Sequence, residues 1–132
     1  NNEELYTANL ESFLTELQEV DKEIGSILKP YRGRKILVFH PAFGYFCDHY
    51  DIHQLPIEIE GKSPGPKQIE NVIEEAREEQ IKIIFVQPQF DKKSAEKIAE
   101  AIEGAVVSLN PLHEDVLENL EIIAENIKGN LQ

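Results

Sequence analysis

Short apolar runs alternate with amphipathic segments from residue 35 to residue 128, and this alternation constrains the fold more than any other feature. Continuous apolar runs are typical of strands buried on both faces, and a 3.6-residue period is typical of helices. Strands that alternate with helices form right-handed βαβ units around a parallel sheet. We therefore predict one α/β domain with a four-stranded parallel sheet flanked by helices. The expected strands are 35–39, 53–59, 81–86 and 105–109, and the expected helical segments are 41–50, 66–80, 92–103 and 113–128.

A long amphipathic helix is predicted over residues 2–29, ahead of this domain. Its apolar stripe repeats at spacings of four and three residues, and Pro30 and Gly33 end it. At a rise of about 1.5 Å per residue the helix is about 40 Å long, whereas a domain of this size is only about 30 Å across. We expect the helix to extend beyond its own domain and to offer an apolar surface to a partner. The stripe consists of Tyr6, Leu10, Phe13, Leu17, Val20, Ile24 and Ile27.

The overall composition excludes some classes of protein. The formal net charge is −12, which argues against a nucleic-acid partner because such proteins need basic surfaces. The sequence contains a single cysteine, Cys47, so it predicts no internal disulfide. No apolar run reaches the roughly 20 residues of a membrane span, and no signal peptide is evident. These features fit either an intracellular protein or a mature or truncated product.

Polar side chains follow three of the predicted strands. The first is His40, and the others are Gln87 and Asn110, with His113 three residues further on. Ligands of open parallel sheets bind beyond the carboxyl ends of the strands, where the strand order reverses, so we expect these side chains to converge there. A neutral imidazole is a good ligand for zinc. The residue pattern alone favours the simpler interpretation, in which His40 bonds to a neighbouring carbonyl.

A second group of candidates lies between the first two predicted strands. His49 and His53 flank Asp51 and suggest a surface metal cluster, but the pattern favours a solvated surface. Cys47 is interpreted as a small packed residue, because no activating base or oxyanion site accompanies it. The nucleotide-binding patterns GxGxxG and GxxxxGK[ST] do not occur in the chain, whereas the loop GKSPG at 61–65 fits the short hydrolase pattern GxSxG.

Three blocks resemble one known family. These blocks are FHPAFGYF at 39–46, FVQPQF at 85–90 and LNPL at 109–112, and they are similar to the second lobe of zinc- and manganese-binding solute receptors of ABC transporters, the ZnuA/TroA type. The segment LYTAN at 5–9 resembles the helix that joins the two lobes of that family. The resemblance implies a connecting helix over residues 1–30 and a C-terminal α/β lobe over residues 31–132.

The resemblance also implies a metal site. Receptors of this type hold the ion between two lobes, and His40 takes the position of the third ligand, with the histidine of the zinc-type receptors. Asn110 stands at the position of a ligating aspartate and is the candidate fourth ligand, with water or His113 as alternatives. Gln87 stands where relatives often carry glutamate. The implied ion is Zn²⁺, with Mn²⁺ as the alternative, and it is a transported ligand.

The expected partners follow from the same resemblance. They are the divalent ion, a first lobe with two histidines that these residues do not include, and an ABC permease at the membrane. The implied location is extracytoplasmic, no enzymatic activity is expected, and the chain is interpreted as a truncated form or a proteolytic product. The exposed stripe around Tyr6, Leu10 and Phe13 predicts that the isolated chain forms homodimers. The alternatives are an intracellular α/β domain, acting as a small hydrolase or nucleotide-binding module, and a dimerisation module.

Overall fold

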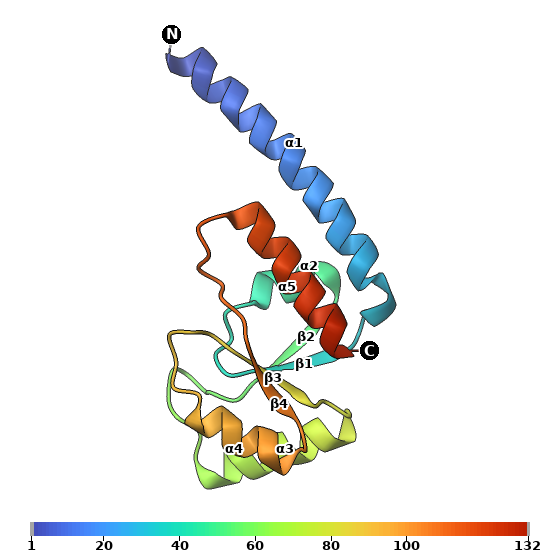
Figure 1. Ribbon diagram of the computed structural model, residues 1–132, viewed down its shortest axis with the longest axis vertical. Helices are drawn as coiled ribbons and strands as arrows, with labels where there is room; N and C mark the ends of the chain where they lie inside the picture. Colours follow the sequence, from blue (N-terminus) through green and yellow to red (C-terminus); the bar gives the residue numbers. More distant parts are fainter. Residues whose placement is uncertain (1, 132) are drawn as a thin grey trace.

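The computed structural model describes residues 2–131 and contains a single parallel sheet with helices on both faces, preceded by a long helix (Figure 1). The elements are α1 (Asn2–Leu28), the short 3-10 turn η1 (Lys29–Tyr31), β1 (Lys35–Val38), α2 (Gly44–Tyr50), β2 (His53–Pro56), α3 (Pro66–Glu78), β3 (Ile83–Val86), α4 (Lys93–Ala101), β4 (Ala105–Ser108) and α5 (Val116–Leu131). The predicted fold class is confirmed. None of the helices within residues 2–131 has the length and apolar character of a membrane span.

The sheet has the strand order β2-β1-β3-β4, and all three pairings are parallel. Residues of β1 pair with residues 18 positions later in β2, from Lys35 with His53 to Val38 with Pro56. The chain leaves β1 toward one side of the sheet and leaves β3 toward the other. The strand order therefore reverses between β1 and β3, and a ligand crevice is expected at their carboxyl ends.

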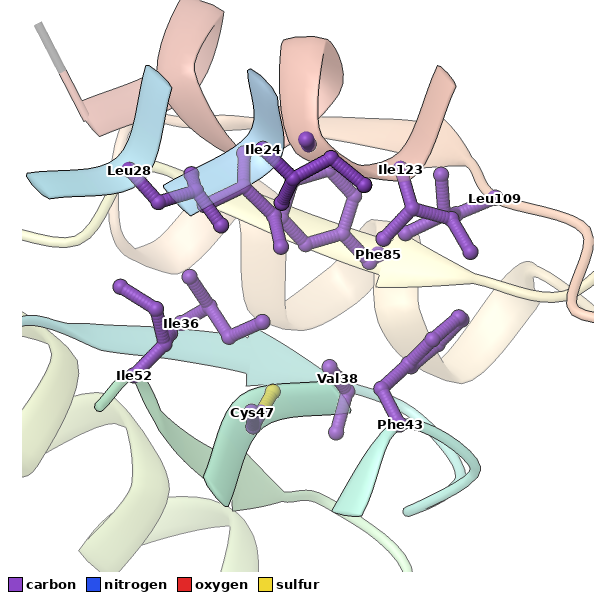
Figure 2. Close-up of a cluster of buried hydrophobic side chains, with 12 residues drawn as sticks. Ile24, Leu28, Ile36, Val38, Phe43, Cys47, Ile52, Phe85, Leu109 and Ile123 are labelled. Atoms are coloured by element: carbon purple, nitrogen blue, oxygen red, sulfur yellow. The ribbon is translucent and has the colours of Figure 1, made fainter. Parts of the chain in front are cut away.

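Two apolar cores fill the spaces between the sheet and its helices. One lies on the face covered by α1, α2 and α5, and Figure 2 shows its side chains meeting from both helices and strands. The other lies on the face covered by α3 and α4. Phe85 of the central strand β3 is 1% exposed and belongs to the first core, whereas its neighbours Ile84 and Val86 belong to the second. Burial on both faces explains why β3 is a continuous apolar run.

Helix α1 extends far beyond the sheet, as its length predicts (Figure 1). Residues 2–16 are all exposed, and the buried residues of this helix are Ile24 and Leu28, close to its C-terminus. The C-terminal part of α1 packs against α5. Large apolar side chains therefore remain in solvent on the N-terminal half of α1, namely Leu5, Tyr6, Leu10, Phe13 and Leu14.

The same backbone turn ends α2, α3 and α4. In α4, the N–H of Gly104 donates to the carbonyl of Ala99, and the N–H of Glu103 donates to the carbonyl of Glu100. This pair of bonds is the Schellman motif, which requires a left-handed residue after the helix. That residue is usually glycine, but here Asp51, Gln80 and Glu103 adopt φ values of 58°, 57° and 53°. Each turn directs the chain into the next strand.

Some element boundaries differ from the predicted ones. Strand β2 was expected to reach residue 59 but ends at Pro56, although the N–H groups of Ile57 and Glu58 still donate to Val38 and Phe39. Helix α5 was expected from about residue 113 but begins at Val116, where the Asp115 carboxylate accepts a hydrogen bond from the N–H of Glu118. Such a bond satisfies one of the free N–H groups of the first turn and fixes the start of the helix.

Candidate functional site

His40 lies just beyond the carboxyl end of β1, beside the point where the strand order reverses. The ladder with β3 continues past β1, because the N–H of Phe39 donates to the carbonyl of Phe85 at 2.8 Å. The next residue leaves the sheet, and Pro41 prevents the strand from continuing. The backbone thus fixes the place from which the imidazole emerges.

The His40 ring is held on two sides. Its Nδ1 atom lies 2.5 Å from Oε2 of Glu58, whose side chain is only 8% exposed. Its face stacks on the ring of Phe90, with the centroids 5.1 Å apart and 20° between the planes. The His40 side chain remains 39% exposed, and its Nε2 atom has no hydrogen-bond partner among residues 2–131. The ring is therefore fixed in orientation and still open to a ligand at one nitrogen.

Gln87 lies beyond the end of β3 and is brought to His40 as predicted. Its Nε2 donates to the backbone carbonyl of His40 at 2.8 Å, and the residue is 2% exposed. The Oε1 atom of Gln87 is buried and has no partner within the described part of the chain. A buried acceptor without a partner costs about 1–3 kcal/mol. Gln87 therefore anchors the backbone of the His40 turn, while its amide oxygen is buried without a partner in the described part of the chain.

Asn110 follows β4, as expected, but its amide oxygen is already engaged. Oδ1 accepts a hydrogen bond from the N–H of Leu112 at 3.1 Å and one from Nε2 of Gln89 at 3.3 Å. The first of these is the local turn that asparagine side chains form with the backbone two residues on. An amide oxygen has two lone pairs, so both are in use. The role of Asn110 as a metal ligand stays a prediction, and it requires the release of at least one of these bonds.

The other three histidines form no hydrogen bond with His40 among the described residues. The Nδ1 atom of His113 accepts a hydrogen bond from the N–H of Asp115 at 3.2 Å, and no hydrogen bond within residues 2–131 joins it to His40 or Asn110. His49 contacts Asp21 of α1, and His53 is exposed at the opposite end of β2 from the site. Across the described residues, no group of three or more His, Cys, Asp or Glu side chains is arranged to hold a metal ion. Within residues 2–131, His40 therefore belongs to no cluster of three or more such side chains.

A polar cluster that sequence patterns did not indicate connects α1 to α2. Oδ1 of Asp21 accepts hydrogen bonds from the Tyr50 hydroxyl at 2.8 Å and from Nε2 of His49 at 2.7 Å. The hydrogen bond from Tyr50, followed by that from His49, lowers the pKa of the Asp21 carboxyl below its ordinary value. Burial, followed by the bond to Asp21, raises the pKa of the Tyr50 hydroxyl. This cluster links α1 to α2, beside the packing of α1 against α5.

Phe43 and Cys47, which follow the His40 turn, are buried in the first core, whereas Tyr45 is exposed. Phe43 is buried in the first core, and its N–H donates to Oε1 of Gln54 at 3.3 Å. Tyr45 is 96% exposed and does not pack beneath this turn. Cys47 is buried, and burial raises the pKa of its thiol to about 12, so it stays protonated near neutral pH.

Comparison with known proteins identifies the fold and the family. The profile of the ZnuA family, described as "Zinc-uptake complex component A periplasmic", matches residues 1–131. The chain belongs to the ZnuA family. A crystal structure of ZnuA superimposes with a TM-score of 0.96 at 39% identity, covering 99% of this chain and 51% of that one. A zinc-bound deletion mutant of ZnuA superimposes with a TM-score of 0.91 at 40% identity, covering 98% of this chain and 50% of that one.

The curated members of the ZnuA family are longer than this chain. The high-affinity zinc uptake system protein ZnuA of Haemophilus influenzae is 31% identical over 114 residues, which are 85% of this chain and 34% of that protein. The chain spans less than half the length of the curated relatives it matches and about half of the solved ones. The domain described above is therefore equivalent to one part of a larger ZnuA-type protein.

Proposed function

We propose that this chain is the C-terminal half of an extracytoplasmic receptor that binds zinc and delivers it to an ABC transporter. This function makes and breaks no covalent bond. The domain contributes the His40 imidazole, whose orientation is already fixed before the ion binds. The observation that carries the proposal is the His40 imidazole at the reversal of strand order, with Nδ1 on a buried carboxylate and Nε2 open. Membership of the ZnuA family supports this reading over a hydrolase or nucleotide-binding module.

Zinc is the preferred ion in this proposal, and manganese is the alternative. Imidazole nitrogen suits zinc, whereas manganese favours carboxylate, carbonyl and water oxygens. At the ends of β3 and β4 the polar side chains are the neutral amides of Gln87 and Asn110. In this arrangement Asn110 becomes a further ligand only if its Oδ1 leaves Leu112 or Gln89, and otherwise water takes that position.

The other half of the receptor supplies the remaining ligands. Zinc sites that keep one position open use about three protein ligands, and His40 alone provides one. The exposed apolar residues of α1 offer the surface on which that half would pack, because α1 continues beyond this domain on the side of its N-terminus. The preceding half is the occupant that fits this surface, since the chain matches about half of the solved relatives.

Zinc titration of two proteins tests the proposal. The 132-residue chain is compared with a longer protein in which a ZnuA-type first half precedes it. We expect the longer protein to bind zinc at least about 100-fold more tightly, because each missing ligand should matter at least as much as an outer-shell partner, whose loss costs about 10- to 100-fold. Competition with a chromophoric chelator measures both affinities. Equal affinities would contradict a site shared between two halves.

Self-association of the isolated chain follows from the same exposed stripe. Without the other half, we expect two copies to pair through Leu10 and its neighbours, because contiguous apolar surface of this kind favours association. Sedimentation at increasing concentration should show a dimer, and Leu10→Lys should shift the equilibrium to monomer. Ala8→Lys is the matched control, since at about 100° per residue position 8 lies on the opposite face of α1. A wild-type chain that stays monomeric at high concentration would exclude this pairing.

A further inference from the structure

Glu58 is a buried carboxylate with one polar contact. Its side chain is 8% exposed, and its contact is the 2.5 Å approach of Oε2 to Nδ1 of His40. No other hydrogen bond or ion pair engages this side chain within residues 2–131. A carboxylate taken out of water is costly unless it is paired and hydrogen-bonded. The fold therefore buries the Glu58 carboxylate against His40, the candidate metal-binding side chain.

The sheet fixes this contact. The β1–β2 ladder continues past the end of β2, since the N–H of Glu58 donates to the carbonyl of Phe39 at 3.0 Å. The pairing offset of 18 residues therefore reaches from His40 to Glu58. Phe90 stacks on the ring from the other strand end, beyond β3. The imidazole is held from both neighbouring strands, and a flip of the ring would break the Glu58 contact.

The contact also selects one tautomer of the neutral ring. A carboxylate accepts hydrogen bonds and donates none, so Nδ1 must carry the proton that lies between the two groups. Nε2 then has a free lone pair, and it is the nitrogen that has no partner within the described chain. Ligating histidines commonly donate their second N–H to a carboxylate, which fixes ring orientation and raises ligand basicity.

We propose that Glu58 is a positioning residue that holds His40 as the Nδ1–H tautomer and presents Nε2 to a divalent cation. This inference rests on the proposed function and adds the coordinating atom and the group that aims it. Glu58 is also the negative charge that this domain places against His40, because Gln87 and Asn110 are neutral. A cation bound at Nε2 compensates the buried carboxylate through the imidazole.

Nuclear magnetic resonance of the metal-free 132-residue chain tests the first half of the proposal. Long-range ¹H–¹⁵N spectra near pH 8 distinguish the two histidine tautomers, and we expect the Nδ1–H form at His40. In Glu58→Gln the amide can donate to Nδ1, so a population of the Nε2–H form should appear. Glu60→Gln is the matched control, because Glu60 is exposed and its replacement changes the charge equally. A wild-type His40 in the Nε2–H form would overturn the proposal.

Titration of the same samples with zinc chloride tests the second half. Zinc should shift the Nε2 resonance of His40, and Glu58→Gln should weaken this binding about 10- to 100-fold, the usual effect of losing an outer-shell partner. Glu60→Gln should change it by less than about 3-fold. Unchanged affinity in Glu58→Gln would overturn the proposal. A His40 ring that zinc does not perturb in the longer protein, which also contains a first half, would overturn the proposed function itself. The tautomer of the metal-free chain tests the role of Glu58 separately.

Discussion

Replacing His40 by alanine is expected to lower the zinc affinity of a receptor that contains this half by more than about 100-fold. The loss of a direct ligand should exceed that of an outer-shell partner, which costs about 10- to 100-fold. His40 is also partly exposed, and its Nε2 has no hydrogen-bond partner among the described residues. Chelator competition on the longer protein measures the affinity, and thermal unfolding without metal checks that the fold is kept.

Two other histidines serve as controls for this result. His53→Ala removes an exposed imidazole at the start of β2, at the far end of the strand from the site, and should leave zinc affinity unchanged. His113→Ala tests the alternative ligand, whose Nδ1 is held by the turn before α5. The assignment of His40 is wrong if its replacement has no more effect than that of His53.

Replacing Gly104 by alanine is expected to destabilise the domain by about 3 kcal/mol or more, above the usual cost of overpacking. A Cβ atom at this position would lie 2.0 Å from the carbonyl oxygen of Lys82 and 2.7 Å from its carbonyl carbon. These are backbone atoms, so no change of rotamer relieves the overlap. The same carbonyl accepts the hydrogen bond from Ala105 that begins the β3–β4 pairing, so relief would require the two strands to separate.

Gly25 provides the matched control for this substitution. It lies inside α1, and a Cβ atom there would meet nothing within 4 Å. Alanine is favoured over glycine in a helix interior by about 0.5–1 kcal/mol, so Gly25→Ala should stabilise the chain slightly. Urea unfolding of both variants measures the two free energies. Similar unfolding midpoints for Gly104→Ala and the wild type would show that the strands tolerate the extra methyl group.

Local patterns in the sequence were sufficient to predict the α/β class and the long helix. Apolar runs buried on both faces specify parallel strands, and the stripe of α1 specifies both a helix and a surface for a partner. The boundaries were less well predicted, since Pro56 ends β2 while Ile57 and Glu58 remain bonded to β1. Alternation of apolar residues does not distinguish a strand from an extended segment that follows it.

The positions of the candidate side chains were predicted in part. His40 and Gln87 were placed at neighbouring strand ends, because parallel strands bring their carboxyl ends to one edge. The Asn110 side chain was considered as a ligand, whereas the Asn-Pro pair is itself a turn signal, and its Oδ1 bonds to the N–H of Leu112. The turn after β4 therefore uses the Asn110 oxygen that the resemblance to the receptor family implied as a metal ligand.

The sequence by itself determined which residues form strands and helices and which imidazole stands at the end of a strand, because those properties depend on neighbours along the chain. Only the tertiary structure decided that Glu58 contacts that imidazole. An acidic residue between Ile57 and Ile59 is typical of a solvent-facing position, and nothing nearby in the chain indicates otherwise. The register of β2 against β1 brings it under His40, and register is set by how whole strands pack into the two cores.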